Sequence, residues 1–539
     1  MIWIVRDFDL LSVLLRAVSF ALEALSFGGV FFLLVAAHPA GLSAGMQQRL
    51  RHVAGWFALA LAVVQILLIA ITSVVLMGGS GLGLRDLLSA SYFISGSIFT
   101  LSALAMFLLL RARIGVIPTV AAALIALGAS IALSHAASRM DHRPLLLALT
   151  AVHHLGMAAW IGALPFLLMA LKLSRDPAIA HAMARRFSAM AIVSVVALIL
   201  AGAGLSWFYV GSWQGLYGTS YGILLSSKMA LTLLMLALGA GNYYLVRGVE
   251  SNPSPLLFRL RRFSEAELGL AFTVLLAAAS LTAQSPSVDE LPQNTLVGHD
   301  VVQRMEWRWP SFHTPAFAQL APPTPLSIAV PEAAFTGGSI SDANDRAWSE
   351  YNHHWAGLIV LLAGLLALVS RLPGQAWARN WPLLFLGLAV FILLRADPEC
   401  WPLGPRPFWA SFTAPDVLEH RLYAFLIAAF AFFEWGVENG RLRWPRARFI
   451  FPALCAAGGA LLLTHTHNLG EGTDEVFAEL SHTPIAVLGA AAGWGRWLEL
   501  RLGDSPADAE QARARRLASW FWPACLIVIG LLLLNYRES

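Results

Sequence analysis

Charged residues are scarce in this chain, and their scarcity limits the class of protein it can be. Of the 539 residues, 13% are charged and 58% are hydrophobic, with a mean hydropathy of +0.67. Soluble domains carry about 25% charged and about 45–50% apolar residues. The composition therefore excludes an ordinary soluble fold and predicts a membrane protein with many transmembrane segments.

Cysteines are few and nucleotide-binding motifs are missing. The three cysteines, Cys400, Cys455 and Cys525, are odd in number and lack CxxC spacing, which argues against a disulfide framework or a c-type haem attachment site. We interpret Cys455 as a packing residue. No phosphate-binding P-loop is present, so we do not expect an ATP-driven transporter. A cleavable signal peptide is also not indicated, and we expect the first apolar run to stay as an anchor.

Long apolar runs are what the chain has in abundance. About fourteen of them approach the 17–25 residues that cross a bilayer, and their continuous apolarity indicates helices, not a β-barrel. The predicted fold class is an all-α, polytopic transmembrane helical bundle. The runs lie near residues 10–37, 53–77, 92–110, 116–137, 145–171, 187–210, 221–246, 264–284, 353–370, 381–395, 417–437, 448–467, 479–498 and 517–535.

A change in composition divides these runs into two groups. Residues 286–352 are rich in Pro, Gly and Ser and show no amphipathic period, which is typical of a linker outside the membrane. The sequence therefore predicts a first membrane domain at 1–285, a periplasmic linker at 286–352 and a second membrane domain at 353–539. About eight helices belong to the first domain and about six to the second.

The basic residues predict the orientation in the membrane. About 22 Lys and Arg residues fall in one set of loops and about 9 in the other, and the basic set is expected on the cytoplasmic side. The net charge of +4 then reflects these loops and not a nucleic-acid partner. Both termini and the linker are predicted to lie outside. In a bacterium this places a multi-pass protein in the inner membrane, with these parts in the periplasm.

Histidines sort to the predicted outer face. Nine of the fifteen fall near the outer ends of helices: His135, His153, His154, His353, His354, His420, His465, His467 and His482. Imidazole is the commonest metal ligand and suits copper, zinc, iron and nickel. A lone histidine at a helix end is more often an interfacial or capping residue, and that interpretation stays open for each of them.

Two groups of these histidines are candidate metal sites. In the first, His135, His153 and His154 are joined by Met157, which is four residues from His153 and adds a thioether that favours copper over zinc. In the second, Glu479 shares a helix face with His482 and is joined by histidines of three other helices. The second group is His420, His465, His467 and His482, with His353 and His354 as further candidates.

Charged residues inside apolar runs are a separate signal. Glu23 and Lys228 lie within predicted helices, where charge costs at least about 2.5–3.5 kcal/mol and is usually paired or lines a polar path. We interpret both as lining a transport path, with an internal ion pair as the alternative. Arg496 and Glu499 fall near the inner interface, where they are expected to extend toward water.

At this point the residues resemble a known family. The segments "TAVHHLGMAAWIGALPFLLMAL", "LSHAAS", "SSKMALTLLMLALGAGNYY" and "LRRFSEAELGLAFTVLLAAASLTAQSP" are similar to the copper resistance protein D family over about residues 1–285. The His–Leu–x–x–x–x–Trp–x–Gly pattern begins at His154. The second half, with "HHWAG", "LEHRLY" and "SHTPIAVLGAAAGWGRWLELR", resembles the carboxyl-terminal extension of longer members.

The resemblance implies an inner-membrane protein of copper homeostasis that moves copper across the membrane. It also implies a small periplasmic copper carrier, which would be a separate protein because no strand-rich segment is present here. The expected ligand is copper as Cu(I) or Cu(II), the other surroundings are lipid, and no enzymatic activity is expected. The competing hypothesis is a b-type haem or other redox membrane protein that uses the paired histidines.

Overall fold

The computed structural model describes residues 8–79, 83–174, 176–248, 253–315, 340–413, 415–442, 444–464, 473–503 and 507–538. Within these ranges the chain is helical and contains no β-strand. By its internal contacts it divides into two compact units. Unit 1 contains the chain up to Leu296, and unit 2 contains most of the chain from Val297 onward.

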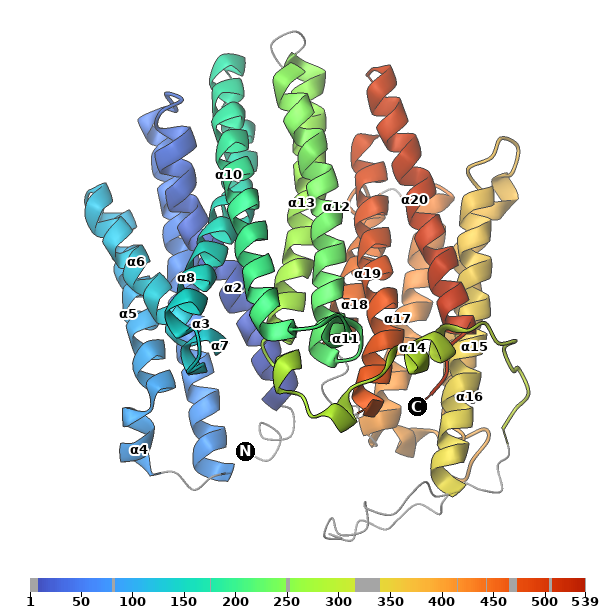
Figure 1. The fold of residues 1–539 in the computed structure, drawn as a ribbon. Helices are drawn as coiled ribbons and strands as arrows, with labels where there is room; N and C mark the ends of the chain where they lie inside the picture. Colours follow the sequence, from blue (N-terminus) through green and yellow to red (C-terminus); the bar gives the residue numbers. More distant parts are fainter. Residues whose placement is uncertain are drawn as a thin grey trace. The chain divides into compact units, whose positions relative to one another are not determined.

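Unit 1 consists of helices that run along one another (Figure 1). Two of its membrane segments contain a π-helical turn, η1 and η2, where one extra residue widens the helix. The elements are α2 (Phe8–Phe32), η1 (Leu33–Ala37), α3 (Ala44–Gly79), α4 (Leu84–Ser89), α5 (Ser91–Ala112), α6 (Val116–Ala132), α7 (His135–Ser138), α8 (Arg143–Met157), η2 (Ala158–Gly162), α9 (Leu164–Leu173), α10 (Pro177–Val210), α11 (Trp213–Tyr217), α12 (Ser220–Gly248) and α13 (Pro253–Leu281), followed by η3 (Ser287–Asp289) and η4 (Pro292–Asn294).

Unit 2 begins with a short helix and continues with six longer helical segments. These elements are α14 (Gly298–Met305), α15 (Ile340–Val369), η5 (Ala376–Leu383), α16 (Leu384–Arg395), η6 (Trp409–Thr413), α17 (Pro415–Glu438), η7 (Ala447–Phe449), α18 (Ile450–Leu462), α19 (Thr473–Leu502) and α20 (Ala509–Leu534). The segment predicted as a linker outside the membrane contains η3, η4 and α14, and α15 begins within it at Ile340.

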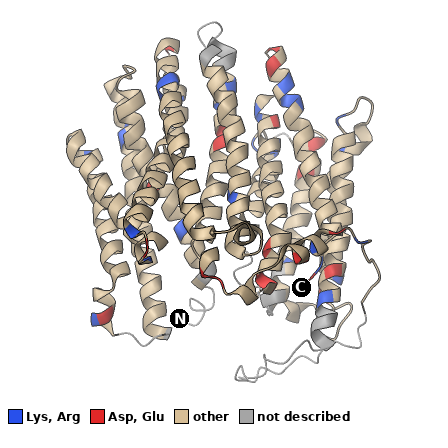
Figure 2. Cartoon of the chain, viewed as in Figure 1, with Lys and Arg blue, Asp and Glu red and all other residues tan. Residues whose placement is uncertain are grey.

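Every one of the predicted apolar runs lies on a helix. Among the described residues, 11 helices are long and apolar enough to cross a membrane. Two of the remaining runs form shorter apolar helices, Val116–Ala132 and Ala447–Leu462, and the third lies on α17. Figure 2 shows long stretches without charge along the helices. The described part of the chain is thus all-helical, as expected of a membrane protein with many spans, while the count of fourteen stays a prediction.

The helix boundaries change the depth of several candidate residues. We expected His153 and His154 at the start of a helix, but α8 begins at Arg143, so His153 lies ten residues, or about 15 Å, along it. His482 and His353 likewise lie inside helices that begin at Thr473 and Ile340. His135 belongs to α7, separate from the preceding helix. The first turns of these helices are polar, so the apolar runs in the sequence did not show where the helices begin.

Small residues let the helices of unit 1 approach closely where its site is formed. A Cβ on Gly162 would lie 1.8 Å from the backbone oxygen of Ala24, and one on Gly28 would lie 2.1 Å from the carbonyl carbon of Gly162. The turn η2 therefore packs directly against the backbone of α2. Such small-residue contacts are the usual way in which helices associate in lipid, where no hydrophobic effect drives them together.

Unit 2 has an aromatic core and similarly close helix pairs. Trp381 and Trp522 are fully buried, with ring centroids 5.5 Å apart, and Phe451 packs against both. A Cβ on Gly459 of α18 would lie 2.4 Å from the nitrogen of Ala490 of α19. These contacts fix the register of the helices that carry the charged and histidine side chains of unit 2.

Candidate metal centre

A histidine–carboxylate pair lies inside unit 1. His154 of α8 places its Nδ1 atom 3.0 Å from Oε1 of Glu23 of α2. The second carboxylate oxygen of Glu23 accepts a hydrogen bond of 2.9 Å from Ser130 of α6. Glu23 has no exposed surface, so the two contacts satisfy a carboxylate that would otherwise be costly to bury. Three helices thus meet at one polar point in an apolar bundle.

The neighbouring histidine faces a different part of unit 1. A Cβ on Gly202 of α10 would lie 3.5 Å from the ring of His153, so this ring packs against α10. Lys228 of α12 and His154 are close enough to interact with it electrostatically. The Nδ1 atom of His153 is buried and has no hydrogen-bond partner among the described residues. Successive helical residues point in different directions, so the doublet does not form one chelating pair.

His135 lies at the end of α13. Its Nε2 atom is 3.0 Å from the carbonyl oxygen of Thr282, which also accepts a hydrogen bond of 3.2 Å from Arg16. Burial lowers the pKa of His135, and Arg16 and Arg139 lower it further, against the opposing effects of the Thr282 hydrogen bond and Asp289. His135 is therefore neutral at neutral pH, which is the form that can bind a metal.

Sequence reasoning missed a second buried carboxylate in unit 1. Glu267 of α13 accepts hydrogen bonds from the indole of Trp160 of η2, at 2.9 Å, and from the amide of Asn242 of α12, at 2.7 Å. It is 2% exposed. The predicted span started at residue 264, which placed Glu267 at an interface. Because α13 begins at Pro253, Glu267 lies well inside the helix. The signal that could have identified it from the sequence is a charged residue within an apolar run.

Two predicted ligands of unit 2 come together around a tyrosine. The rings of His353 of α15 and His482 of α19 have centroids 5.9 Å apart. Tyr536 stacks on His353 at 3.7 Å and meets His482 edge-on at 5.6 Å. Burial and the carboxylate of Glu538 raise the pKa of Tyr536, and its hydroxyl donates a hydrogen bond of 2.8 Å to that carboxylate.

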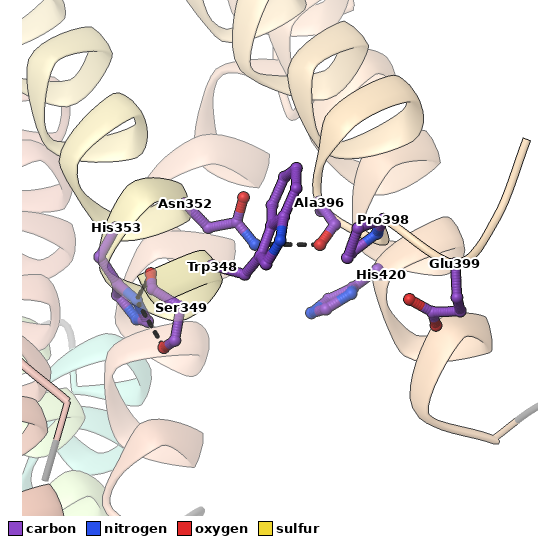
Figure 3. Close-up of a pocket in the computed structure, with 8 residues that line it drawn as sticks. All are labelled: Trp348, Ser349, Asn352, His353, Ala396, Pro398, Glu399 and His420. Atoms are coloured by element: carbon purple, nitrogen blue, oxygen red, sulfur yellow. Dashed lines mark hydrogen bonds between the residues drawn. The ribbon is translucent and has the colours of Figure 1, made fainter. Parts of the chain in front are cut away.

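A pocket of about 280 Å³ lies beside His353 in unit 2 (Figure 3). His420 of α17 lines it together with His353, and Glu399 lies beyond His420. The Nδ1 atom of His420 is 2.6 Å from Oδ1 of Asp397. Asp397 is itself 3.7 Å from the buried guanidinium of Arg421. His420 is therefore held by a carboxylate that has a second charged partner.

Four of the candidate histidines share one arrangement of the imidazole. In each, Nδ1 lies within hydrogen-bonding distance of a carboxylate or backbone carbonyl: Glu23 for His154, Asp397 for His420, Ser349 at 2.8 Å for His353 and Ala478 at 2.9 Å for His482. An Nδ1–H that donates to oxygen fixes the tautomer that leaves Nε2 as the metal-binding nitrogen.

The other predicted ligands are engaged differently or lie outside the described residues. Both ring nitrogens of His354 are within hydrogen-bonding distance of the backbone, Nδ1 at Ser311 and Nε2 at the oxygen of Tyr536. Glu479 is buried and accepts a hydrogen bond of 2.6 Å from Thr483. Met157 is buried at the end of α8. His465 and His467 fall outside the described residues.

No complete metal-binding group is assembled in the part of the chain that the structure describes: it contains no cluster of three or more His, Cys, Asp or Glu side chains that could hold an ion. What it shows are pairs, His154 with Glu23 and His353 with His482. A pair of imidazoles can serve as part of a site that other ligands complete, and a histidine–carboxylate pair can supply one oriented ligand.

Part of the chain is similar to known proteins. Residues 181–281 match a family model described as copper resistance protein D. This segment is therefore similar to the copper resistance protein D family. Copper transport protein CutJ of Bacillus subtilis (strain 168) is 27% identical to the chain over 145 residues, which is 26% of the chain and 26% of that relative. The matched part thus spans about a quarter of the curated relative. No solved structure matches the chain.

The matched segment covers part of unit 1. It holds Gly202, Lys228, Asn242 and Glu267, whereas the pair of Glu23 and His154 lies before it. Both matches are to proteins named for copper resistance or copper transport, and neither is to a haem protein.

Proposed function

We propose that the protein binds copper at its periplasmic face and moves it across the bacterial inner membrane. The observation that carries the proposal is the shared setting of His154, His353, His420 and His482, whose Nδ1 atoms are all held by oxygen. This is the setting in which ligating histidines are found in metal sites. The family match supports copper as the metal.

In unit 1 the proposed entry site consists of His135, His153, His154 and Met157. Soft thioether and imidazole ligands suit copper better than magnesium or calcium. Glu23 would orient His154 and, together with Lys228, would line the path inward. The buried Nδ1 atom of His153 has no hydrogen-bond partner among the described residues, so this nitrogen is available to bind a metal.

In unit 2 the proposed second site is centred on His353 and His482, with His420 across the adjoining pocket. Glu479, His354, His465 and His467 are further candidate ligands from the sequence. Copper would arrive at this face from a separate periplasmic carrier protein. The basic loops support an orientation in which both termini face the periplasm. We propose no catalysed reaction.

Metal analysis of the purified full-length protein tests the second site. After exposure to copper, His353→Ala/His482→Ala should hold less copper per chain than the wild type. The matched control is His38→Ala, which removes an exposed histidine at the opposite set of helix ends. Equal copper in wild type and double variant would rule out this site. An absorption spectrum of the same samples without a Soret band would agree with the absence of haem.

Transport is tested separately in cells. Cellular copper, measured at controlled external copper with and without the protein, should differ, and the sign of the difference gives the direction of movement. Identical copper contents and identical copper tolerance would contradict transport, even if the purified protein binds the metal.

A further inference from the structure

Five charged side chains gather inside unit 2, away from its histidines. Glu434 and Glu438 come from α17, Arg496 and Glu499 from α19, and Arg371 follows α15. Glu434 has no exposed surface, and Arg496 and Glu499 are 4% and 3% exposed. Arg496 and Glu499 were expected near the inner interface, extending toward water. Their burial shows that they do not simply do so.

Glu499 is the best satisfied of the three carboxylates. It accepts a hydrogen bond of 2.7 Å from Arg496 and one of 2.8 Å from the indole N–H of Trp522, and it forms an ion pair of 3.0 Å with Arg371. The guanidinium carbons of Arg496 and Arg371 each lie 5.3 Å from the centroid of the Trp522 ring. Two positive charges therefore share one carboxylate and one aromatic ring.

Glu434 is the least satisfied of the three. Its Oε1 atom is 3.3 Å from Arg496, which also bonds to Glu438. Its Oε2 atom is buried and has no hydrogen-bond partner among the described residues. An ionised carboxylate would need partners for both oxygens at this depth. Glu434 therefore has the surroundings of a neutral, protonated acid.

The summed charge of the five-residue cluster also indicates a protonated Glu434. Three carboxylates and two guanidinium groups sum to one negative charge if all are ionised, and one added proton makes the cluster neutral. The groups that act on Glu434 are Arg371 and Arg496, which attract a negative charge, and Glu438, which repels it. The thiol of Cys455 on α18 also lies within electrostatic range. The excess of one carboxylate leaves a place for one cation.

We propose that this cluster is a proton-binding site of unit 2, with the proton held on Glu434 and exchanged as the protein works. A proton fits a single free carboxylate oxygen, whereas ions such as Ca²⁺ require six or more oxygen ligands. Loss of the proton would leave three carboxylates to share two arginines. The arginines would then redistribute, which would shift α17 against α19. The role in copper movement rests on the proposed function, but the proton site itself does not.

Infrared difference spectroscopy of the full-length protein in detergent tests the site without copper. The wild type should show the C=O stretch of a protonated carboxylic acid at neutral pH, and the band should disappear as the pH is raised. Glu434→Gln should abolish the titrating band. Glu438→Gln, the matched change one turn along α17, should retain it.

Thermal stability distinguishes a proton site from a merely structural carboxylate. Gln mimics a neutral Glu, so Glu434→Gln should unfold near the wild-type temperature at neutral pH and at a higher temperature than the wild type at alkaline pH. Glu499→Gln should be less stable at both pH values, because it removes the shared partner of the buried Arg496 and the partly buried Arg371. Glu434→Asp serves as a second variant that can still carry the proton.

Two results would overturn the proposal: an unchanged carboxylic acid band in Glu434→Gln, or stabilisation of the wild type by sodium ions in place of protons. Copper movement into proteoliposomes, measured at several internal pH values, then addresses coupling. A wild type whose copper movement depends on pH and a Glu434→Gln variant that does not respond would support coupling. If the wild type moves no copper while the acid band is present, the proposed function fails and the proton site stands.

Discussion

The buried carboxylates of unit 1 and those of the charged cluster in unit 2 have different kinds of partner. In unit 1, Glu23 is held by His154 and Ser130, and Glu267 is held by Trp160 and Asn242. In the cluster of unit 2, Glu438 and Glu499 are held mainly by arginine, a cation that cannot lose its charge. The donors in unit 1 are neutral or titratable, so its carboxylates keep the capacity to favour an arriving cation.

This difference separates two uses of buried charge. A carboxylate that faces a permanent cation is already neutralised, and its main effect is to hold helices together. A carboxylate behind a histidine strengthens that histidine as a ligand. The comparison therefore favours Glu23 as the carboxylate of the proposed metal chemistry, and Arg496 and Glu499 as the groups of bundle cohesion. The predictions below test this division, from the largest expected effect to the smallest.

Substitution of Arg496 by Gln should have the largest effect on stability. Removing one partner of a buried ion pair leaves the others uncompensated and costs about 3–5 kcal/mol, and here Glu438 and Glu499 lose their closest charged partner. The unfolding temperature in detergent should fall strongly. The control is Arg513→Gln, a change at an exposed arginine of α20. Equal stability of the two variants would show that the buried cluster does not hold unit 2 together.

The contact between α2 and η2 should be the next most sensitive point. Gly162→Ala would bring a Cβ to 1.8 Å from the backbone oxygen of Ala24. Overpacking of this kind costs about 1–3 kcal/mol, and the displaced η2 would also move the indole of Trp160 away from Glu267. The unfolding temperature in detergent should fall accordingly.

Gly128→Ala is the matched control for that contact. A Cβ on Gly128 of α6 meets nothing within 4 Å, and Ala is favoured over Gly within a helix by up to about 1 kcal/mol. This variant should be as stable as the wild type or more so. If Gly162→Ala is equally well tolerated, the backbones of α2 and η2 are not in the close contact described.

The helices could be predicted from the sequence because membrane spans are set by one coarse quantity, the length of an apolar run. Helix beginnings could not, because first turns such as "TDEVFAEL" at Thr473 are polar and fall outside the apolar window. This error moved His153, His353 and His482 toward the surface in the prediction. The same error concealed Glu267 as an interfacial residue.

Pairing between helices was the other limit. The sequence left open which histidine of each doublet has a functional role, and the structure shows that His153 and His154 face different helices. Arg496 was expected to reach water, but it finds its partners on α17, which lies far away in the sequence. Periodicity reports which face of one helix is polar and says nothing about which helix it meets. The sequence could therefore suggest that His353 and His482 lie at the same face of the protein, but it could not show that their rings are in contact.

The role of Glu23 is tested by copper affinity. If Glu23 orients His154 as a ligand, Glu23→Gln should weaken copper binding about 10–100-fold, the usual loss when a partner behind a metal ligand is removed. Competition with a chelator at constant pH measures this change. Glu267→Gln is the matched control, since it alters a buried carboxylate of the same unit whose partners are Trp160 and Asn242. An unchanged affinity in Glu23→Gln would contradict the division between the two units.

The smallest expected effect is the pH dependence that His135 contributes. Burial lowers its pKa from the ordinary value of 6.5, so the unfolded chain takes up this proton before the folded one does. Above about pH 6.5 His135 is neutral in both the folded and the unfolded state, so it does not lower the free energy of unfolding. That free energy decreases as the pH falls from this value toward the lower pKa of the folded state. His135→Gln can still donate a hydrogen bond to Thr282 but cannot be protonated. The wild type should therefore lose stability relative to His135→Gln between about pH 7 and pH 5, as measured by unfolding in detergent. Because the other titratable groups are common to both proteins, a difference that stays constant across this range would show that His135 is as open to water as a free histidine.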